Sequence, residues 1–410
     1  MTPIEIADGR AGAAAGDLFE YYVARVYAPA KAEAAELQRL RREDSRLVNR
    51  VREIMVMEEM ATPRPAHLLA RGAYDAPRDE VPRDTPSALP PFDPELPRNR
   101  LGLARWLTGR QNPLAARVAV NRIWRMHFGR GVVASQEDFG SQGRLPSHPE
   151  LLDWLAARFM DSGWDVKALQ KLIVTSATFK QSSHAAPEQL AKDPENRLLS
   201  RGPTTRMSAE EIRDSALAAS GLLTSTVGGP SVKPYQPAGL WEQSGTGKTY
   251  VQDHGDKLYR RSLYTFWRRT SPPPSMLTFD AMSREVCTAK REVTNTPLQA
   301  LVLLNDPQFV EASRALAGRL LRTFPNNPSA RNRDAFRTLI GRVPDAEEAA
   351  ILARLFIEQR DLFAASPHAA RSVVRIGESV PDPLLPAADY AAMTTVVSAI
   401  MNFDEFVMER

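Results

Sequence analysis

The sequence predicts a mainly α fold with short irregular β elements, built as a helical domain with an N-terminal helical segment. Apolar residues recur at spacings of three and four residues in many segments, which is typical of helices that bury one face. Helix-capping residues precede several of these segments, and strand-like alternation is confined to one short stretch. A composition of 43% hydrophobic and 25% charged residues excludes a disordered or fibrous chain.

The N-terminal part, residues 17–60, contains good helix formers and no glycine. Pro29 is its one helix breaker, so we expect two helices that meet there. In the second, over 31–60, Leu37, Leu40 and Leu47 form an apolar stripe that suits half of a helical hairpin. Residues 1–61 are therefore predicted to be an N-terminal helical segment, the remnant of a preceding region.

Residues 62–98 are rich in proline. Proline lacks the backbone N–H and fixes φ, so this segment cannot form a regular helix and is predicted to be an extended connector. Beyond it, residues 99–410 are expected to form one large, mainly α domain.

Within that domain, cap signals place the helices. Asn112–Pro113 predicts the start of a helix that ends at Gly129. The patterns Ser147-x-x-Glu150 and Ser208-x-x-Glu211 match the capping box. Further helices are expected after Asp165, over 294–322 in two parts around Asp306–Pro307, and over 346–364 and 387–400.

The segment 224–290 differs, because glycine and proline interrupt it throughout and residues 261–267 alternate like a short strand. The expected core of the domain consists of large apolar residues on the predicted helices. These are Trp106, Trp124, Trp154, Leu155, Phe159, Trp164 and Leu172.

The charged residues give little support for a nucleic-acid partner. The chain has 44 arginines, 9 lysines and a net charge of +4, but acidic residues are interspersed among the arginines, as in residues 39–52. Nucleic-acid-binding proteins show a one-sided basic patch instead. The string SGTGKT at 244–249 is not a phosphate-binding loop, because Glu242 occupies the position where that motif requires glycine.

The histidines suggest one catalytic hypothesis. His127 and His148 flank a glycine-containing connection that carries Asp138, and with His254 they could form a His/Asp site of a hydrolase. The alternative is that His127 ends a helix and His148 lies in a helix cap. No H-E-x-x-H spacing is present, and whether a metal binds stays open.

Arginine and aromatic residues suggest a binding surface. Residues 259–269 interleave the two types, which suits stacking on a sugar or base, although a strand core with solvated arginines is the favoured interpretation. Residues 280–295 suggest a polar network, with Cys287 expected as a buried, unreactive thiol. The candidate binding residues are Arg122, Trp241, Arg261, Tyr264, Arg284, Arg291 and Asn295.

Four long strings identify a family resemblance. They are NRIWRMHFGRGVVASQEDFGSQGRLPSHPELLDWLAARF from Asn121, GGPSVKPYQPAGLWE from Gly228, HGDKLYRRSLYTFWRRTSPPPSMLTFDAMSREVC from His254 and TNTPLQALVLLND from Thr294. The chain resembles the planctomycete-type domain of unknown function 1553 over about residues 99–360. NFDEFVMER, from Asn402, is similar to the usual ending of that family.

The resemblance implies a setting rather than a reaction. Members form the C-terminal part of exported proteins that begin with a c-type cytochrome module and a domain of unknown function 1549. The resemblance implies that the protein is extracytoplasmic, in the periplasm or cell envelope. It also implies an accessory or binding module that is linked to polysaccharide use. Its partner would be an upstream domain or a cytochrome c-bearing protein.

The chain departs from that plan. Cys287 is its single cysteine, so no C-x-x-C-H haem site exists and haem c is expected only in full-length relatives. The first 22 residues show no signal-peptide pattern, and no run approaches the roughly 18 apolar residues of a membrane span. We therefore expect either a fragment of a longer protein or a shortened relative.

Overall fold

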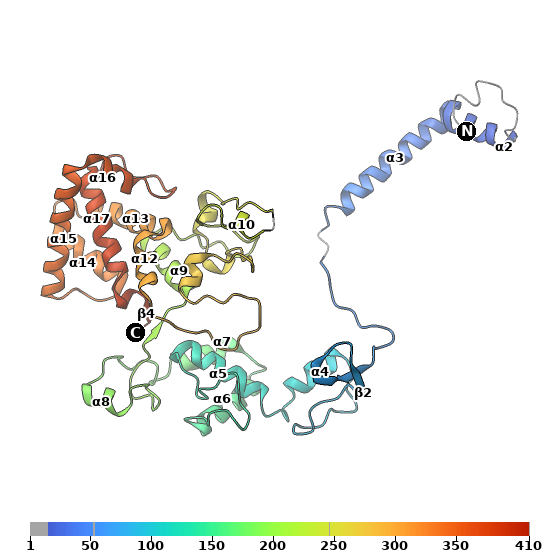
Figure 1. Ribbon diagram of the computed structural model, residues 1–410, viewed down its shortest axis with the longest axis horizontal. Coiled ribbons are helices and arrows are strands. Elements are labelled where there is room, and N and C mark those ends of the chain that lie inside the picture. The colour runs from blue at the N-terminus through green and yellow to red at the C-terminus, as the bar shows by residue number, and fades with distance from the viewer. Residues whose placement is uncertain (1–14, 52–53, 246, 410) are drawn as a thin grey trace. The chain divides into compact units, whose positions relative to one another are not determined.

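The computed structural model describes residues 15–51, 54–245 and 247–409 (Figure 1). Over these residues the protein is mainly α, with two pairs of short antiparallel strands, which confirms the predicted fold class. The chain divides into two compact units, one of residues 1–84 with 97–101 and the other of residues 85–96 with 102–410. None of the described helices is both long and apolar enough to cross a bilayer.

The first unit begins with α2 (Ala15–Tyr21), a π-helical turn η1 (Tyr22–Val26) and α3 (Ala28–Val48). Pro29 lies in the first turn of α3, where the backbone N–H groups have no intrahelical acceptor and proline is tolerated. The predicted helix to residue 60 is wrong, since residues 54–60 have no regular secondary structure. Val51, Ile54 and Val56 are exposed there, so no packing offsets the low helix propensity of β-branched residues.

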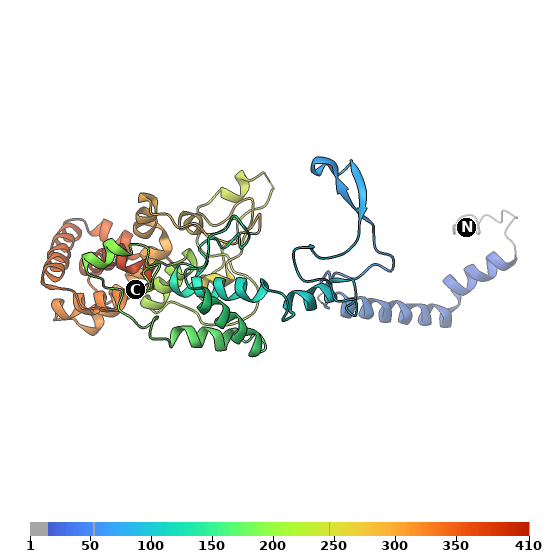
Figure 2. The same ribbon diagram turned by 90° about the horizontal axis from the view of Figure 1, so that it is seen from below.

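A β-hairpin lies within the expected connector (Figure 2). Its strands are β1 (Ala66–Leu69) and β2 (Pro77–Val81), and the turn between them includes a short 3-10 helix, η2 (Ala70–Gly72). Proline is tolerated at the first position of a strand, which is where Pro77 stands. Residues 62–98 are therefore not extended throughout.

In the second unit, α5 (Ala115–Phe128), α6 (Pro149–Asp161) and α7 (Val166–Val174) surround one apolar core (Figures 1 and 2). α4 (Arg100–Thr108) precedes them. The helix predicted from Asn112–Pro113 is present but begins later, at Ala115 with Leu114 as its N-cap, and Asn112 Oδ1 accepts the Ala115 N–H at 3.1 Å. The core contains Trp124, Leu155 and Phe159, as expected.

Two expectations in this region are wrong. Trp154 is 52% exposed, on the outer face of α6, where the guanidinium of Arg158 lies 5.6 Å from its ring. Ser147 does not cap α6. The helix begins at Pro149, since proline favours the first helical position, and Ser147 Oγ donates instead to the Val132 carbonyl at 3.3 Å. Trp106, Trp164 and Leu172 are partly buried.

The larger core of the second unit centres on α17 (Ala387–Met401), whose Val396, Val397 and Ile400 are fully buried. α17 packs against α13 (Pro307–Thr323), α15 (Ala346–Ala365) and α16 (Pro367–Val374). The other helices are α8 (Pro187–Lys192), α9 (Ala209–Ser220), α10 (Leu240–Gln243), α11 (Pro274–Thr278), α12 (Pro297–Asn305) and α14 (Pro328–Ile340).

Several caps and turns in this core agree with the sequence. The capping box at Ser208 is confirmed, with the Ser208 N–H donating to Glu211 Oε2 at 2.7 Å. The expected break at Asp306–Pro307 separates α12 from α13, and Asp306 caps the second helix. Near the C-terminus lies a 3-10 turn, η5 (Asp404–Phe406), and β3 (Thr205–Arg206) pairs with β4 (Met408–Glu409).

The expected strand at 261–267 is absent from the described structure. The 3-10 turns η3 (Gly255–Tyr259) and η4 (Ser262–Tyr264) occupy this region, joined to neighbours by isolated bridges only. Arg213, buried in α9, donates to the carbonyls of Leu258 and Arg260 at 2.7 Å each. Those carbonyls immediately precede the expected strand. Within 261–267, the Ser262 N–H donates to Asp214 Oδ1 at 2.8 Å and the Tyr264 N–H to the Arg261 carbonyl at 2.9 Å, so a side chain and a local turn use backbone groups that sheet pairing would need.

Candidate functional site

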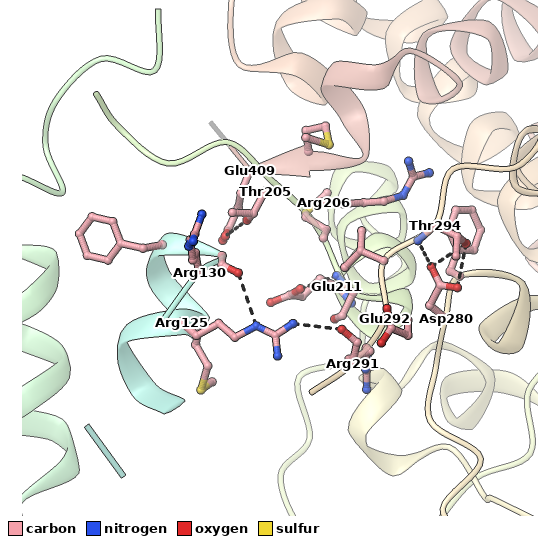
Figure 3. Close-up of a pocket in the computed structure, with 18 of the residues that line it drawn as sticks. Arg125, Arg130, Thr205, Arg206, Glu211, Asp280, Arg291, Glu292, Thr294 and Glu409 are labelled. Carbon is pink, nitrogen blue, oxygen red and sulfur yellow. Dashed lines mark hydrogen bonds between the residues drawn. The ribbon is translucent and has the colours of Figure 1, made fainter. Parts of the chain in front are cut away.

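A cavity of about 990 Å³ lies in the second unit, among the end of α5, β3, β4, the start of α9 and the segment that follows α11 (Figure 3). Its wall contains five arginines and seven acids beside apolar side chains. The arginines are Arg122, Arg125, Arg130, Arg206 and Arg291, and the acids are Glu195, Glu210, Glu211, Asp280, Glu292, Asp404 and Glu409. Guanidinium donors and carboxylate acceptors thus share one cavity.

Glycine at the end of α5 allows β3 to form one side of this cavity. Gly129 has φ +70°, and a Cβ at this position would lie 2.1 Å from Cγ2 of Thr205. Any larger residue would push β3 away from α5. Because β3 pairs with β4, the same approach places Arg206 and Glu409 on the cavity wall.

An ion pair attaches the segment after α11 to α9. Arg291 Nη1 lies 2.7 Å from Glu210 Oε2, and Nη2 donates to Oε1 at 3.2 Å. Burial by itself raises the pKa of Glu210. The hydrogen bonds from Arg291 and the backbone, together with the positive charges of Arg291 and Arg284, have a larger effect in the opposite direction. The pKa of Glu210 therefore lies below its usual value. Glu210 is therefore an ionised carboxylate already committed to a partner.

We call residues 281–296 the strap, because they line the cavity without forming a helix or strand. Asp280, at φ +60°, joins the two ends of the strap by accepting hydrogen bonds from Thr294 N at 2.7 Å and Thr294 Oγ1 at 2.8 Å. Trp267 Nε1 donates to the Ser283 carbonyl at 2.9 Å, and the Arg284 guanidinium lies 4.4 Å from the Trp267 ring. These contacts fix the strap at its ends.

Arg125 connects α5 to the strap. It donates from Nη1 to Gln136 Oε1 and from Nη2 to the Arg291 carbonyl, each at 3.0 Å. Burial lowers the pKa of Arg125, although the charges of Glu292 and Glu137 oppose that effect. Gln136 is 7% exposed, and its Nε2 has no hydrogen-bond acceptor in the described part of the chain.

Two carboxylates occupy contrasting environments. Glu211 accepts the Ser208 N–H and so completes the helix cap. Glu409, on β4, receives a 3.5 Å hydrogen bond from Thr205 Oγ1. Burial and the negative charge of Glu211 raise the pKa of Glu409 above its usual value. The cavity therefore holds acids of differing acidity.

The residues of the predicted hydrolase site contact different partners. His127 lies edge-on to Phe179, burial lowers its pKa, and its Nε2 is buried without a partner among the described residues. Asp138 accepts the Gly140 N–H at 2.7 Å. His148 Nδ1 lies 3.0 Å from Ser147 Oγ, and His254 hydrogen-bonds Glu378 at 2.6 Å.

None of these four described residues lines the cavity. Across the described part of the chain, no group of three or more His, Cys, Asp or Glu side chains could hold a metal ion. The His/Asp hydrolase site remains a prediction.

The predicted binding residues divide between two places. Arg122, Arg291 and Asn295 line the cavity, and Arg284 acts on Glu210 through its charge. The other three predicted residues, Trp241, Arg261 and Tyr264, lie outside the cavity. Trp241 is buried beneath Arg268, and Arg261 lies 3.7 Å from Asp214. The ring of Tyr264 lies 3.7 Å from the guanidinium of Arg260. Cys287 is exposed on the strap, so the expected buried thiol is wrong.

Several cavity residues were not predicted. Arg125 is one turn after Arg122 on α5, so helical spacing could have identified it. No sequence pattern links Arg206 to Glu409, because the two residues lie far apart along the chain and only the pairing of β3 with β4 brings them together.

Comparison with known proteins assigns the chain to a family. The model of the family PSD1, described as protein of unknown function (DUF1553), matches residues 99–356. The chain belongs to this family. No curated protein and no solved structure matches it. The matched region contains the cavity residues of α5, β3, α9 and the strap, while Asp404, Met408 and Glu409 lie beyond it.

Proposed function

We propose that this DUF1553 protein is a binding module that holds a polysaccharide chain in the cavity beside the strap. The observation that carries this proposal is the wall of the cavity, where arginines and carboxylates lie together over about 990 Å³. A sugar hydroxyl both donates and accepts hydrogen bonds, so neighbouring hydroxyls can pair with a carboxylate and a guanidinium at once. The volume is at the upper end of ligand pockets, which suits more than one sugar ring.

The proposed setting is the cell envelope, where the module would act beside an upstream domain or a cytochrome c-bearing protein. This part of the proposal is supported by the family resemblance of the sequence. Any haem c would belong to that partner, since a C-x-x-C-H motif does not occur in this chain. Co-purification of the protein with its native neighbours tests the association, and recovery without any cytochrome-bearing protein would count against it.

Direct binding measurements test the polysaccharide proposal. Isothermal titration of the full chain with oligosaccharides of dextran, chitin and polygalacturonate should give saturable binding to at least one. Replacing Glu210 by Gln should weaken that binding, because Glu210 is a cavity acceptor and anchors the strap. Glu347→Gln is the matched control, since Glu347 lies on α15, outside the cavity. Absence of saturable binding to all three would refute the proposal.

The same oligosaccharides test the hydrolase alternative. A hydrolase would release new reducing ends from them, and the His127→Ala and His254→Ala variants would abolish that release. Binding without release would leave the module as a binder only.

A further inference from the structure

Three arginines of the cavity have no carboxylate partner in the part of the chain that the structure describes. Arg130 is paired with Glu195, and Arg291 with Glu210. Arg122, Arg125 and Arg206 form no ion pair with any residue that the structure describes. Arg122 and Arg125 come from α5 and Arg206 from β3, so these three cations line the cavity from two elements.

Two of the three guanidinium groups are partly buried. Arg125 donates only to uncharged oxygens, those of the Gln136 side chain and of the Gly129 and Arg291 carbonyls. Nε of Arg206 is buried and has no acceptor among the described residues, and the ring of Phe279 lies 5.9 Å from its guanidinium. A guanidinium carries five N–H donors, and a buried charge is ordinarily paired. These side chains therefore retain donor capacity and positive charge toward the cavity.

Four acids of the cavity already have partners. Glu195 and Glu210 form ion pairs with Arg130 and Arg291. Asp280 accepts a hydrogen bond from Thr294, and Glu211 accepts one from Ser208. The pKa of Glu409 is raised, whereas a guanidinium in contact with this carboxylate would lower it. Among the acids of the cavity, Glu292 acts on Arg125 through its charge, but none forms an ion pair with Arg122, Arg125 or Arg206 within the described part of the chain.

We infer that the cavity selects an acidic polysaccharide, whose anionic group is bound by the guanidinium groups of Arg122, Arg125 and Arg206. The inference rests on the proposed function and names its ligand class. A carboxylate of a uronic acid and a sulfate ester share the required chemistry, because each presents two or more oxygens to the planar fork of arginine. Glu211 and Glu409 each accept one of the hydrogen bonds described above, so their remaining lone pairs can accept from hydroxyl groups of the same polysaccharide chain.

The test uses the full chain and three oligosaccharide probes of equal length: polygalacturonate with carboxylates, dextran sulfate with sulfate esters, and uncharged dextran. Arg122→Gln and Arg206→Gln each remove one cation from the cavity. Arg333→Gln removes the same charge from an exposed position of α14 outside the cavity. Circular dichroism and the melting temperature confirm that each variant is folded.

We expect at least one acidic probe to bind more tightly than dextran, with an affinity that falls as salt rises. Each cavity variant should weaken that binding about 10-fold to 100-fold, while Arg333→Gln changes it less than twofold. A higher affinity for polygalacturonate than for dextran sulfate, or the reverse, supports the inference and identifies which anionic group the cavity binds.

Three results would overturn the inference and leave the polysaccharide proposal standing. One is equal binding of dextran and the acidic probes, and another is binding of an acidic probe that neither cavity variant changes. An equal loss in the Arg333→Gln control would also overturn it, because the attraction would then be a general charge effect. Absence of binding to every probe refutes the proposed function itself. The wild-type comparison of probes needs no variant, so a variant that fails to fold does not weaken the test.

Discussion

Replacing Arg291 by Gln should loosen the strap without unfolding the domain. The substitution removes two charge-assisted hydrogen bonds to Glu210, of 2.7 and 3.2 Å, and leaves the Arg291 carbonyl in place for Arg125. Both side chains of the pair are mostly buried, at 30% and 25% exposure. Hydrogen bonds to charged groups in such a setting contribute about 2 kcal/mol, so local opening of the strap should become about 30-fold more frequent.

Hydrogen–deuterium exchange of the strap amides measures this opening directly. Peptides that cover residues 284–293 should exchange faster in Arg291→Gln, while peptides of α17 should not change, because no residue of that helix lines the cavity. Lys290→Gln is the matched control, since Lys290 is an exposed strap residue with the same charge. Equal exchange in the wild type and Arg291→Gln would show that the ion pair does not hold the strap.

Acid should loosen the strap in the same way. Burial raises the pKa of Glu210, but the bonds and charge of Arg291 outweigh it, so the folded-state pKa lies below the usual 4.5. A depressed carboxylate pKa stabilises the fold above the usual value, and this contribution is lost as pH falls through the depressed value. Strap exchange, corrected for intrinsic rates, should therefore be constant from pH 7 to 5 and rise only below about pH 4. A rise between pH 7 and 6 would contradict this reasoning.

Three further substitutions test the supports of the fold by thermal and urea unfolding. Asn121→Ala removes the buried amide that bonds Val133 N at 2.8 Å and Val133 O at 2.9 Å, and should cost about 3 kcal/mol. The exposed Asn326→Ala should cost almost nothing. Glu311→Gln leaves Arg314, 1% exposed, without its buried counter-charge at 3.5 Å, and should also cost about 3 kcal/mol. Gly377→Ala places a Cβ 2.2 Å from Glu311 Cδ at φ +90°, whereas Gly228→Ala, at φ +79°, meets nothing within 4 Å. The Gly377 variant should be less stable by more than about 1 kcal/mol.

Each of these predictions has a contradicting result. Equal stability of the Asn121 and Asn326 variants would mean that the Val133 bonds are replaced by water. Equal stability of the two glycine variants would mean that the loop at Gly377 shifts away from α13 at no cost. An unchanged Glu311→Gln variant would show that the carbonyl oxygens bonded to Arg314 suffice for its charge.

Local signals in the sequence predicted the helical elements well. The capping box at Ser208 and the break at Asp306 lie where expected, because each depends on a few neighbouring residues. Two local expectations failed, the helix to residue 60 and the cap at Ser147. A strand at 261–267 required a partner strand, but Asp214 of α9 accepts the Ser262 N–H instead.

The candidate site follows the same division. Arg291 and Asn295 were predicted from the closely spaced polar residues of 280–295, and both line the cavity, as does Arg122. The approach of β3 to Gly129, and the pairing of β3 with β4, could not be predicted, since neither has a local pattern. The ion pairs that separate committed arginines from available ones are likewise tertiary contacts.

The sequence by itself determined a mainly α chain of the DUF1553 family, with several of its caps and breaks. Tertiary structure alone decided which arginines lack a carboxylate partner and which side chains share a cavity. The physical reason is the separation along the sequence between the groups that interact. A helix cap is satisfied within about four residues, whereas a guanidinium takes its partner from whatever segment the packed core brings near.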